Sequence, residues 1–310
     1  MRIVRNYKLC PESEHNCTII IGNFDAVHKG HQRIISASKI IARHHDHKDS
    51  KTAVLTFEPH PVTVIKKNTE NIRILPLTEK IKRLANIGVE VLFIQKFNQD
   101  FANFSAVDFV KEVLVDNLKA SHLVVGQNFR FGVNKEGDAQ TLKDLGVQHG
   151  FGVSILDLLK TSVDTYSSSQ IRHYLKNADI ERTNNILGYN YYITGRVIKG
   201  DGRGKSIGFP TANVVLKNIL SPMSGVYLAK VYIDGSSKTY YGVANIGDAP
   251  TFGKAEALLE AHILDFNEQI YGKKIKVELL RYIRPQQKFN NVDELILQIQ
   301  KDVRFAKEKF

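Results

Sequence analysis

A run of β-branched residues, Thr18–Ile21, ends at Gly22 and is soon followed by the segment His28–His31, which reads His-Lys-Gly-His. A β-branched run that ends in glycine predicts a strand followed by a tight turn, here leading into a helix. The first N–H groups of a helix have no partner within the helix, and the helix dipole adds partial positive charge, so such a point favours anions. His28 and His31 can both face that anion. The segment therefore predicts phosphate or nucleotide chemistry.

Two histidines at this spacing are also compatible with a zinc site or with an exposed helix face. Cys10 and Cys17 precede the strand without Cys-x-x-Cys spacing, so they supply no evident third ligand. The segment matches neither a Rossmann Gly-x-Gly-x-x-Gly motif nor a Walker A loop. We favour the phosphate role and keep zinc as the alternative interpretation. A second histidine-rich stretch, His44–His47, lies among polar residues and is typical of a solvated loop.

The length and composition of the chain favour a globular protein with two domains. Its 310 residues exceed one typical domain of about 150 residues, and 43% of them are hydrophobic. No apolar run is long enough to span a bilayer, and the first residues lack the apolar core of a signal peptide. The two cysteines indicate a reducing compartment. We expect a cytoplasmic protein without a membrane partner.

The formal net charge of +11 is compatible with nucleic acid or with phosphorylated small molecules as partners. Nucleic-acid binders gather Lys and Arg on one element among aromatic residues. Here the basic residues are spread along the chain, and several fall inside the candidate nucleotide motifs. We therefore expect small anionic ligands and no nucleic acid, and we leave open whether the protein is a homo-oligomer.

The first part of the chain alternates strand and helix patterns, which predicts a parallel sheet covered by helices on both faces. Such sheets bind ligands at the carboxyl ends of their strands. The expected strands are Thr18–Phe24, Ala53–Phe57, Val89–Gln95, Leu123–Gly126 and Gly152–Leu156. One expected helix follows Thr78, a second begins at Ser105, and a third runs from about Asp138 towards Gly150. Two more occupy Ser168–Lys176 and Asp179–Leu187.

From Tyr189 onwards the pattern changes to strands without intervening helices, which predicts an antiparallel barrel or sandwich. The expected strands are Tyr191–Lys199, Gly225–Ile233, Thr239–Ile246, Leu258–Leu264 and Lys274–Ile283. A final amphipathic helix begins after Asn291, which is its expected N-cap. We place the domain boundary near residue 187, with an α/β domain over 1–187 and an all-β domain with a C-terminal helix over 188–310.

Two further motifs of the first domain follow predicted strands. The segment Thr56–Pro61 reads Thr-Phe-Glu-Pro-His-Pro, whose prolines stiffen a loop and whose ring side chains can stack on a planar ligand. The segment Val125–Gly132 contains Asn128, which offers a donor and an acceptor to a ribose or a phosphate. The alternative interpretations are a merely stiffened loop in the first case and core packing of Phe129 and Phe131 in the second.

The segment Ser167–Arg172 reads Ser-Ser-Ser-Gln-Ile-Arg and opens a predicted helix. Its hydroxyls, the free N–H groups of the helix start and Arg172 together can bind phosphates through charge-assisted hydrogen bonds. Serines before a helix are usually only caps, so the residues alone leave both interpretations open.

In the second domain, Gly200–Ser206 looks like a phosphate loop but is one residue short of a Walker A motif. The Gly-Phe-Pro sequence that follows disfavours the helix a Walker loop requires, so we expect a flexible basic flap. Its N–H groups can still cover phosphates.

These motifs together resemble the bacterial bifunctional riboflavin kinase/FAD synthetase family. In the first domain, Gly22–His31 is similar to the signature of the nucleotidyltransferase superfamily, and Thr56–Pro61, Val125–Gly132 and Ser167–Arg172 match later family motifs. The resemblance implies a Rossmann-like domain that joins FMN to the α-phosphate of ATP, releasing pyrophosphate. It implies catalytic roles for His28, His31, Asn128 and Arg172, flavin contacts from Phe57, Pro59, His60 and Asn128, and nucleotide contacts from Gly22, Asn23, Phe24, Asp25, Gly30, Ser168 and Ser169.

In the second domain, the segment Gly208–Asn213 reads Gly-Phe-Pro-Thr-Ala-Asn and resembles the riboflavin kinase motif whose Thr and Asn bind Mg²⁺ and nucleotide phosphates. Thr211 and Asn213 would take that role, beside Gly202 and Lys205 of the flap. Glu260 matches the catalytic base of the kinase, although a lone Glu on a strand is usually a solvated side chain. Arg284 is the expected flavin contact. The resemblance implies a six-stranded antiparallel barrel that uses ATP to convert riboflavin to FMN.

Three positions depart from the family pattern. Ala26 stands where the family usually has Gly, Thr165 where many members have Arg, and Ala249 where the usual residue is Arg. We expect activity to survive at position 26 unless the backbone there needs a positive φ. The Ala249 departure leaves an alternative function open, namely FMN adenylylation alone with an impaired kinase.

Overall fold

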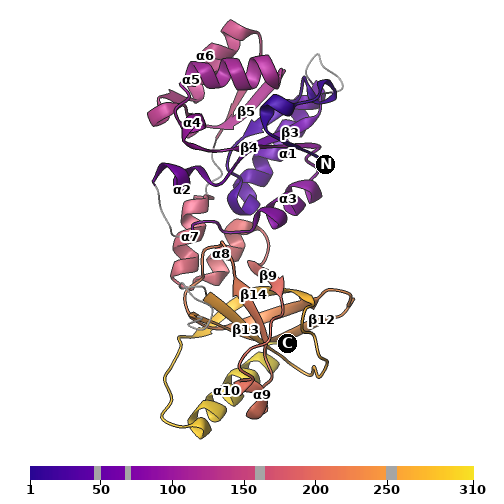
Figure 1. The fold of residues 1–310 in the computed structure, drawn as a ribbon, viewed down its shortest axis with the longest axis vertical. Coiled ribbons are helices and arrows are strands. Elements are labelled where there is room, and N and C mark those ends of the chain that lie inside the picture. Colours follow the sequence, from indigo (N-terminus) through magenta and orange to yellow (C-terminus); the bar gives the residue numbers. More distant parts are fainter. Residues whose placement is uncertain (45–49, 67–70, 158–164, 249–256) are drawn as a thin grey trace. The chain divides into compact units, whose positions relative to one another are not determined.

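The computed structural model describes residues 1–44, 50–66, 71–157, 165–248 and 257–310 (Figure 1). It divides into two compact units, Met1–Ser168 and Ser169–Phe310. The helices α7 (Ser168–Lys176) and α8 (Ile180–Leu187), which the sequence led us to place in the first domain, therefore belong mainly to the second unit. Packing against strand β14 (Lys274–Arg284) explains the grouping of α8.

The first unit is built on a six-stranded parallel sheet in the order β1-β4-β3-β2-β5-β8. Its strands are β1 (Arg2–Arg5), β2 (Thr18–Ile21), β3 (Thr52–Glu58), β4 (Val91–Lys96), β5 (His122–Gly126) and β8 (Gly152–Leu156). This confirms the predicted parallel sheet. Strand β1 was not predicted, because this short edge strand has only two apolar residues, between two arginines, and shows no strand periodicity.

Helices cover both faces of this sheet, as predicted. Ile20 of β2 packs with helix α1 (Lys29–His44) and helix α3 (Leu77–Asn86), whereas Ile19 and Ile21 point to the opposite face. That face is covered by α4 (Gln99–Ala102), α5 (Ala106–Asp108), a π-helix over Phe109–Asn117 and α6 (Ala139–His149). Burial on both faces explains why Ile19–Ile21 of β2 are all apolar.

The caps of these helices follow from their sequence. Ser105 accepts a hydrogen bond from the Asp108 N–H at 3.0 Å, and Asp138 accepts one from the Thr141 N–H at 2.8 Å. Both bonds satisfy an N–H group that has no partner within the helix. Helix α6 ends at Gly150, whose φ of 77° is the left-handed conformation in which helices commonly stop.

The order of the strands sets the position of the candidate site. The chain runs from β2 outward to β3 and β4, and later crosses to β5 on the other side of β2. The carboxyl ends of β2 and β5 therefore border the switch point of the sheet, where open α/β sheets bind ligands. The loops after β3, β2 and β5 carry three of the motifs predicted from the sequence.

The second unit contains a six-stranded antiparallel sheet in the order β10-β13-β12-β11-β14-β9. Its strands, besides β14, are β9 (Tyr192–Arg196), β10 (Ala212–Leu216), β11 (Gly225–Ile233), β12 (Thr239–Asp248) and β13 (Ala257–Ile263). The Ile198 N–H donates to the Asn213 carbonyl at 2.9 Å just beyond β9, so the two outer strands approach each other and nearly close a barrel. This confirms the predicted barrel.

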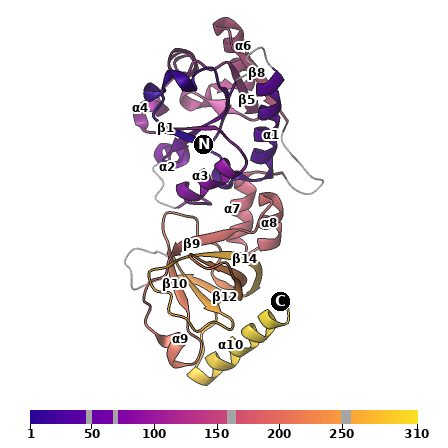
Figure 2. The same cartoon turned by 90° about the vertical axis from the view of Figure 1, so that its right-hand side faces the viewer.

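The final helix α10 (Val292–Lys307) lies against the outside of this barrel (Figures 1 and 2). It packs Val303 and Ala306 on the outward-facing Val226, Leu228 and Val243. Asn291 caps it, as predicted, by accepting a hydrogen bond from the Glu294 N–H at 2.9 Å. The helix therefore covers part of the barrel face that also carries the polar residues described below.

The basic flap differs from expectation in one respect. It contains a single helical turn, α9 (Arg203–Ser206), which begins after Gly202 in the left-handed conformation.

In the part of the chain that the structure describes, no helix is long and apolar enough to cross a membrane.

Candidate functional site

The two histidines of the turn after β2 lie face to face. Their ring centroids are 3.6 Å apart, and Phe24 packs against the His31 ring at 4.9 Å. The His31 N–H also donates to His28 Nδ1 at 3.4 Å. Both rings are held at the start of helix α1, so the turn presents the paired imidazoles that the sequence predicted.

Gly30 packs closely against the His28 ring. A Cβ atom at this position would lie 3.0 Å from the His28 ring and 3.1 Å from the Tyr166 carbonyl oxygen. Any larger residue would therefore displace His28. Two polar atoms of the same turn, Asn23 Oδ1 and His31 Nδ1, are buried without a hydrogen-bond partner among the described residues. Such atoms usually mark a place where a ligand or water completes the hydrogen bonding.

The backbone of the turn is strained at three non-glycine positions. Phe24, Ala26 and Val27 have φ angles of 49°, 70° and 47°. This left-handed region is unfavourable for residues with a Cβ atom, especially a β-branched one, and strain of this kind gathers at functional sites. From the sequence we expected activity to survive at position 26 unless the backbone there needs a positive φ. The structure shows that Ala26 does adopt a positive φ.

Replacing Ala26 by Gly is expected to stabilise the protein by about 1 kcal/mol, because relief of roughly 1–3 kcal/mol of strain outweighs about 0.8 kcal/mol from one buried methyl group. The unfolding midpoint in urea measures the change. Ala42→Gly, in the last turn of α1, is the matched control and should destabilise by about 1 kcal/mol, because it removes a buried methyl group. A lower midpoint for Ala26→Gly would show that the left-handed backbone is not a net cost here.

A set of charged residues surrounds the base of the turn. The Asp25 carboxylate accepts hydrogen bonds from the Ile74 N–H, the shorter at 3.0 Å, and Glu58 forms an ion pair with Arg73. Burial lowers the pKa of His31 well below its usual value, and the nearby His28 and Lys80 lower it further. His31 is therefore a neutral imidazole at pH 7.

The other sequence motifs of the first unit lie at the carboxyl ends of β3 and β5. Phe57 is half-buried against Phe97 and Phe101, and Pro59 is exposed. His60 caps helix α2 (Pro61–Ile65) by accepting a hydrogen bond from the Val62 N–H. Asn128 is exposed in the turn after β5. The neighbouring Phe131 is buried in the core, as its alternative interpretation proposed.

The serine motif straddles the two units. The Ser168 hydroxyl donates to the Asp25 carbonyl at 3.0 Å, which connects the start of α7 to the motif turn within the first unit. Ser169 is exposed and Arg172 is half-buried on α7, both in the second unit. Thr165 is exposed, and Ala249 lies outside the described residues.

In the second unit, three polar side chains share one row across the sheet. Asn213 of β10 pairs in register with Glu260 of β13, which pairs with Asn245 of β12. Asn245 Nδ2 donates to Glu260 Oε2 at 3.1 Å, and Gln286 Nε2 donates to Asn245 Oδ1 at 3.1 Å. These bonds hold the Glu260 carboxylate in one orientation on the outer face of the barrel.

The basic flap folds back beside this row. The Phe209 N–H donates to the Gly204 carbonyl at 2.8 Å, and a Cβ atom on Gly204 would lie 3.5 Å from Thr211 Oγ1. A Cβ atom on Gly200 would lie 2.6 Å from Asn213 Nδ2. The structure therefore brings Gly200 and Gly204 of this flap close to Asn213 and Thr211, with Glu260 next to Asn213 in the sheet. Within the described ranges, no hydrogen bond joins the predicted Gly202 and Lys205 to these residues. In the described residues no group of three or more His, Cys, Asp or Glu side chains is arranged to hold a metal ion.

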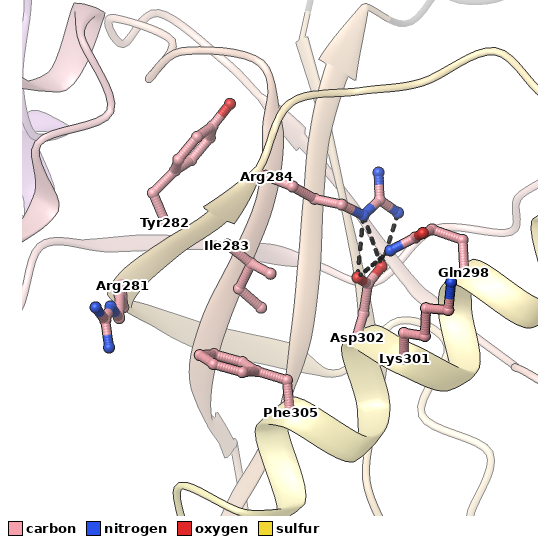
Figure 3. Close-up of a pocket in the computed structure, with 8 residues that line it drawn as sticks. All are labelled: Arg281, Tyr282, Ile283, Arg284, Gln298, Lys301, Asp302 and Phe305. Carbon is pink, nitrogen blue, oxygen red and sulfur yellow. Dashed lines mark hydrogen bonds and ion pairs between the residues drawn. The ribbon is translucent and has the colours of Figure 1, made fainter.

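A pocket of about 450 Å³ lies between the end of β14 and α10 (Figure 3). Arg284 points towards Asp302 in this pocket and donates to it from Nε at 3.0 Å and from Nη2 at 2.7 Å. The ring of Phe305 and the side chain of Ile283 form its apolar part. Arg284 also occupies the sheet row that continues from Glu260 through Asn245 and Val226.

Sequence reasoning missed Lys80, Gln286 and Asp302 as parts of these sites. Gln286 and Asp302 come from segments far from the motifs, and nothing local distinguishes them. Lys80 lies on an amphipathic helix, where a lysine normally faces solvent. The signal was its position within the apolar stripe, beside Ile81 and Leu84.

The comparisons with known proteins match both halves of the chain. A model described as FAD synthetase matches residues 10–170, and one described as riboflavin kinase matches residues 187–310. The chain is 38% identical to the bifunctional riboflavin kinase/FMN adenylyltransferase of Bacillus subtilis, covering 99% of this chain and 96% of the relative. The chain belongs to the bifunctional riboflavin kinase/FMN adenylyltransferase family.

Two further comparisons also extend over nearly the full length of this chain. The Escherichia coli K12 protein of the same name is 35% identical, covering 100% of this chain and 98% of its own. A solved Streptococcus pneumoniae structure, named macrolide-efflux protein, is 29% identical with a TM-score of 0.84 over 97% of both chains. The enzyme has both an FMN adenylyltransferase and a riboflavin kinase domain, and these matches give no support to an impaired kinase.

Proposed function

We propose that the first unit joins the phosphate of FMN to the α-phosphorus of ATP at the turn after β2, with pyrophosphate as the leaving group. The stacked His28 and His31 rings at the start of α1 carry this proposal. Charge that develops on the phosphate oxygens in the transition state would be stabilised by these imidazoles and by the N–H groups of Asn23 and Phe24. Catalysis of phosphoryl and nucleotidyl transfer depends on such positioning and electrostatic stabilisation.

The remaining motif residues would complete this site. Ser168, Ser169 and Arg172 would bind the β- and γ-phosphates, and Asn128 would contact the ribose or the phosphate bridge. Phe57, Pro59 and His60 would contact the flavin. The support is the place of the flavin and Asn128 motifs at the carboxyl ends of β3 and β5, the ligand side of an open α/β sheet, and the hydrogen bond from Ser168 to the Asp25 carbonyl within the first unit.

In the second unit, the Glu260 carboxylate would accept the proton of the ribityl hydroxyl as its oxygen attacks the γ-phosphorus of ATP. The hydrogen bond from Asn245 leaves one carboxylate oxygen for this task. Thr211 and Asn213 offer oxygen ligands for Mg²⁺. With so few protein ligands, phosphate oxygens and water would complete the coordination shell of the ion. Mg²⁺ would there neutralise phosphate charge, while Gly202 and Lys205 of the flap would cover the phosphates.

The pocket between β14 and α10 is the proposed position of the flavin in the kinase. A volume of about 450 Å³ falls within the usual range of small-ligand pockets, roughly 300–1,000 Å³. It combines an apolar wall with polar groups from Arg284, Gln298 and Asp302. The row from Arg284 to Glu260 would let a bound ring system extend its ribityl chain towards the base.

Turnover with separate substrates tests these assignments. Purified protein with riboflavin, ATP and Mg²⁺ is expected to form FMN and then FAD, and with FMN to form FAD directly. Chromatography of the flavins measures both products. Protein that makes FAD from FMN but no FMN from riboflavin would support the alternative of an impaired kinase, and protein that makes neither would contradict both functions.

The proposed partners are therefore small molecules, with no requirement for nucleic acid or a membrane. Cys10 and Cys17 are both free thiols, which agrees with a cytoplasmic location.

A further inference from the structure

Lys80 is a buried lysine that joins three elements beneath the motif turn. Only 8% of the residue is exposed, although it lies on helix α3. Its ammonium donates to the Asn23 carbonyl at 3.1 Å and to Thr56 Oγ1 at 3.1 Å. The Thr56 hydroxyl donates to the same carbonyl at 3.0 Å. Lys80 therefore connects α3, β3 and the turn after β2 at one atom.

A charge in this position is costly to the fold. The pKa of Lys80 is lowered to about 8. Burial is the main cause and Arg73 adds to it, whereas Asp25 and Glu58 act in the opposite direction. The charged and titratable groups that face Lys80 are thus Asp25 of the turn, Glu58 of β3, Arg73 before α3 and His31 of α1. A neutral side chain would join these elements at lower cost. Buried groups with a shifted pKa are common at functional sites.

The bond to Asn23 has a geometric consequence for the next residue. In a planar trans peptide the C=O and the following N–H point in opposite directions. Fixing the Asn23 carbonyl on Lys80 and Thr56 therefore aims the Phe24 N–H away from Lys80. Within the described residues this N–H has no hydrogen-bond acceptor, although Phe24 is only 2% exposed. It is thus an unused donor of the residue whose ring packs on His31.

We propose that Lys80 is a positioning residue of the adenylyl-transfer site, which fixes the Asn23–Phe24 peptide so that the Phe24 N–H can bind a phosphate oxygen of ATP. The inference rests on the proposed role of the His28–His31 turn. The protonated ammonium is the effective form, because it donates to Asn23 and Thr56 and adds positive charge behind the bound phosphates. Loss of its proton weakens both effects.

Lys80→Met, which keeps the length and removes the charge, is expected to lower kcat/KM for ATP in FMN adenylylation by about 10²-fold. Riboflavin phosphorylation by the second unit of the same molecule should not change. The matched control is Lys82→Met, which removes an exposed lysine from the same helix and should leave both activities unchanged. Lys80→Arg keeps a cation and should retain more adenylylation than Lys80→Met.

The pH profile separates a positioning charge from a merely structural contact. In the wild type, kcat/KM for FMN adenylylation is expected to fall as pH rises through about 8, where Lys80 loses its proton. In Lys80→Arg that fall should move to higher pH, because the guanidinium stays protonated.

An unshifted alkaline limb in Lys80→Arg would overturn the proposal, even if Lys80→Met fails to fold. Adenylylation within threefold of wild type in a folded Lys80→Met would also overturn it. Wild-type protein that cannot convert FMN would contradict the proposed function itself, whereas loss confined to the Lys80 variants leaves that function standing.

Discussion

Replacing His31 by Asn is expected to lower kcat for FMN adenylylation by about 10²–10³-fold and to leave riboflavin phosphorylation unchanged. The His31 ring lies between Phe24 and His28, so its removal takes away one polar ring and the packing that orients the other. Because its pKa is far below the usual value, the ring acts as a neutral hydrogen-bonding group. The measurement is FAD formation from FMN, with FMN formation from riboflavin as the internal reference.

The matched control for this variant is His149→Asn. His149 is an exposed histidine in the last turn of α6 in the same unit, and its replacement should change neither activity. An adenylylation rate for His31→Asn close to that of the wild type would remove the stacked pair from the mechanism. Equal loss of both activities would instead indicate general unfolding, which urea titration would detect.

Glu260→Gln is expected to have the opposite pattern. It should lower kcat for riboflavin phosphorylation by about 10²–10⁴-fold, because the amide cannot accept the proton of the attacking hydroxyl. FAD formation from added FMN should stay at the wild-type rate. Gln has nearly the same shape as Glu, so the hydrogen bond with Asn245 is largely kept and the barrel should remain folded.

Glu268→Gln provides the comparison, since Glu268 is exposed in the same unit. Riboflavin phosphorylation that survives Glu260→Gln would show that another group accepts the proton. A rise in KM for riboflavin with unchanged kcat would assign Glu260 to binding rather than to catalysis.

Much of the architecture follows from local patterns that the sequence displays. The continuous β-branched run of Thr18–Ile21 predicted a strand, and the structure has it in the middle of the sheet, buried on both faces. Asn291 and Ser105 cap helices as their sequence context predicted. Strand β10 was not predicted as a strand, because its first two residues, Ala212 and Asn213, were interpreted only as the end of a phosphate-binding motif.

Some features depend on residues that are distant in the sequence. The sequence raised a positive φ at Ala26 as a condition, but the value of 70° follows only from how the turn is held between β2, α1 and α3. The division of α7 and α8 between the units likewise depends on which surface they bury. No pattern within those two helices indicates which unit they pack against.

By itself, the sequence determined the two kinds of fold and the residue types of both sites, because strand and helix periodicity and short motifs are local properties. The tertiary structure alone decided which side chains meet. It stacked His28 on His31 around Gly30, aligned Asn213, Glu260 and Asn245 on one row of the barrel, and buried Lys80 beneath Asn23. The physical reason is that hydrogen bonding and desolvation act between groups brought together by packing, whatever their separation along the chain.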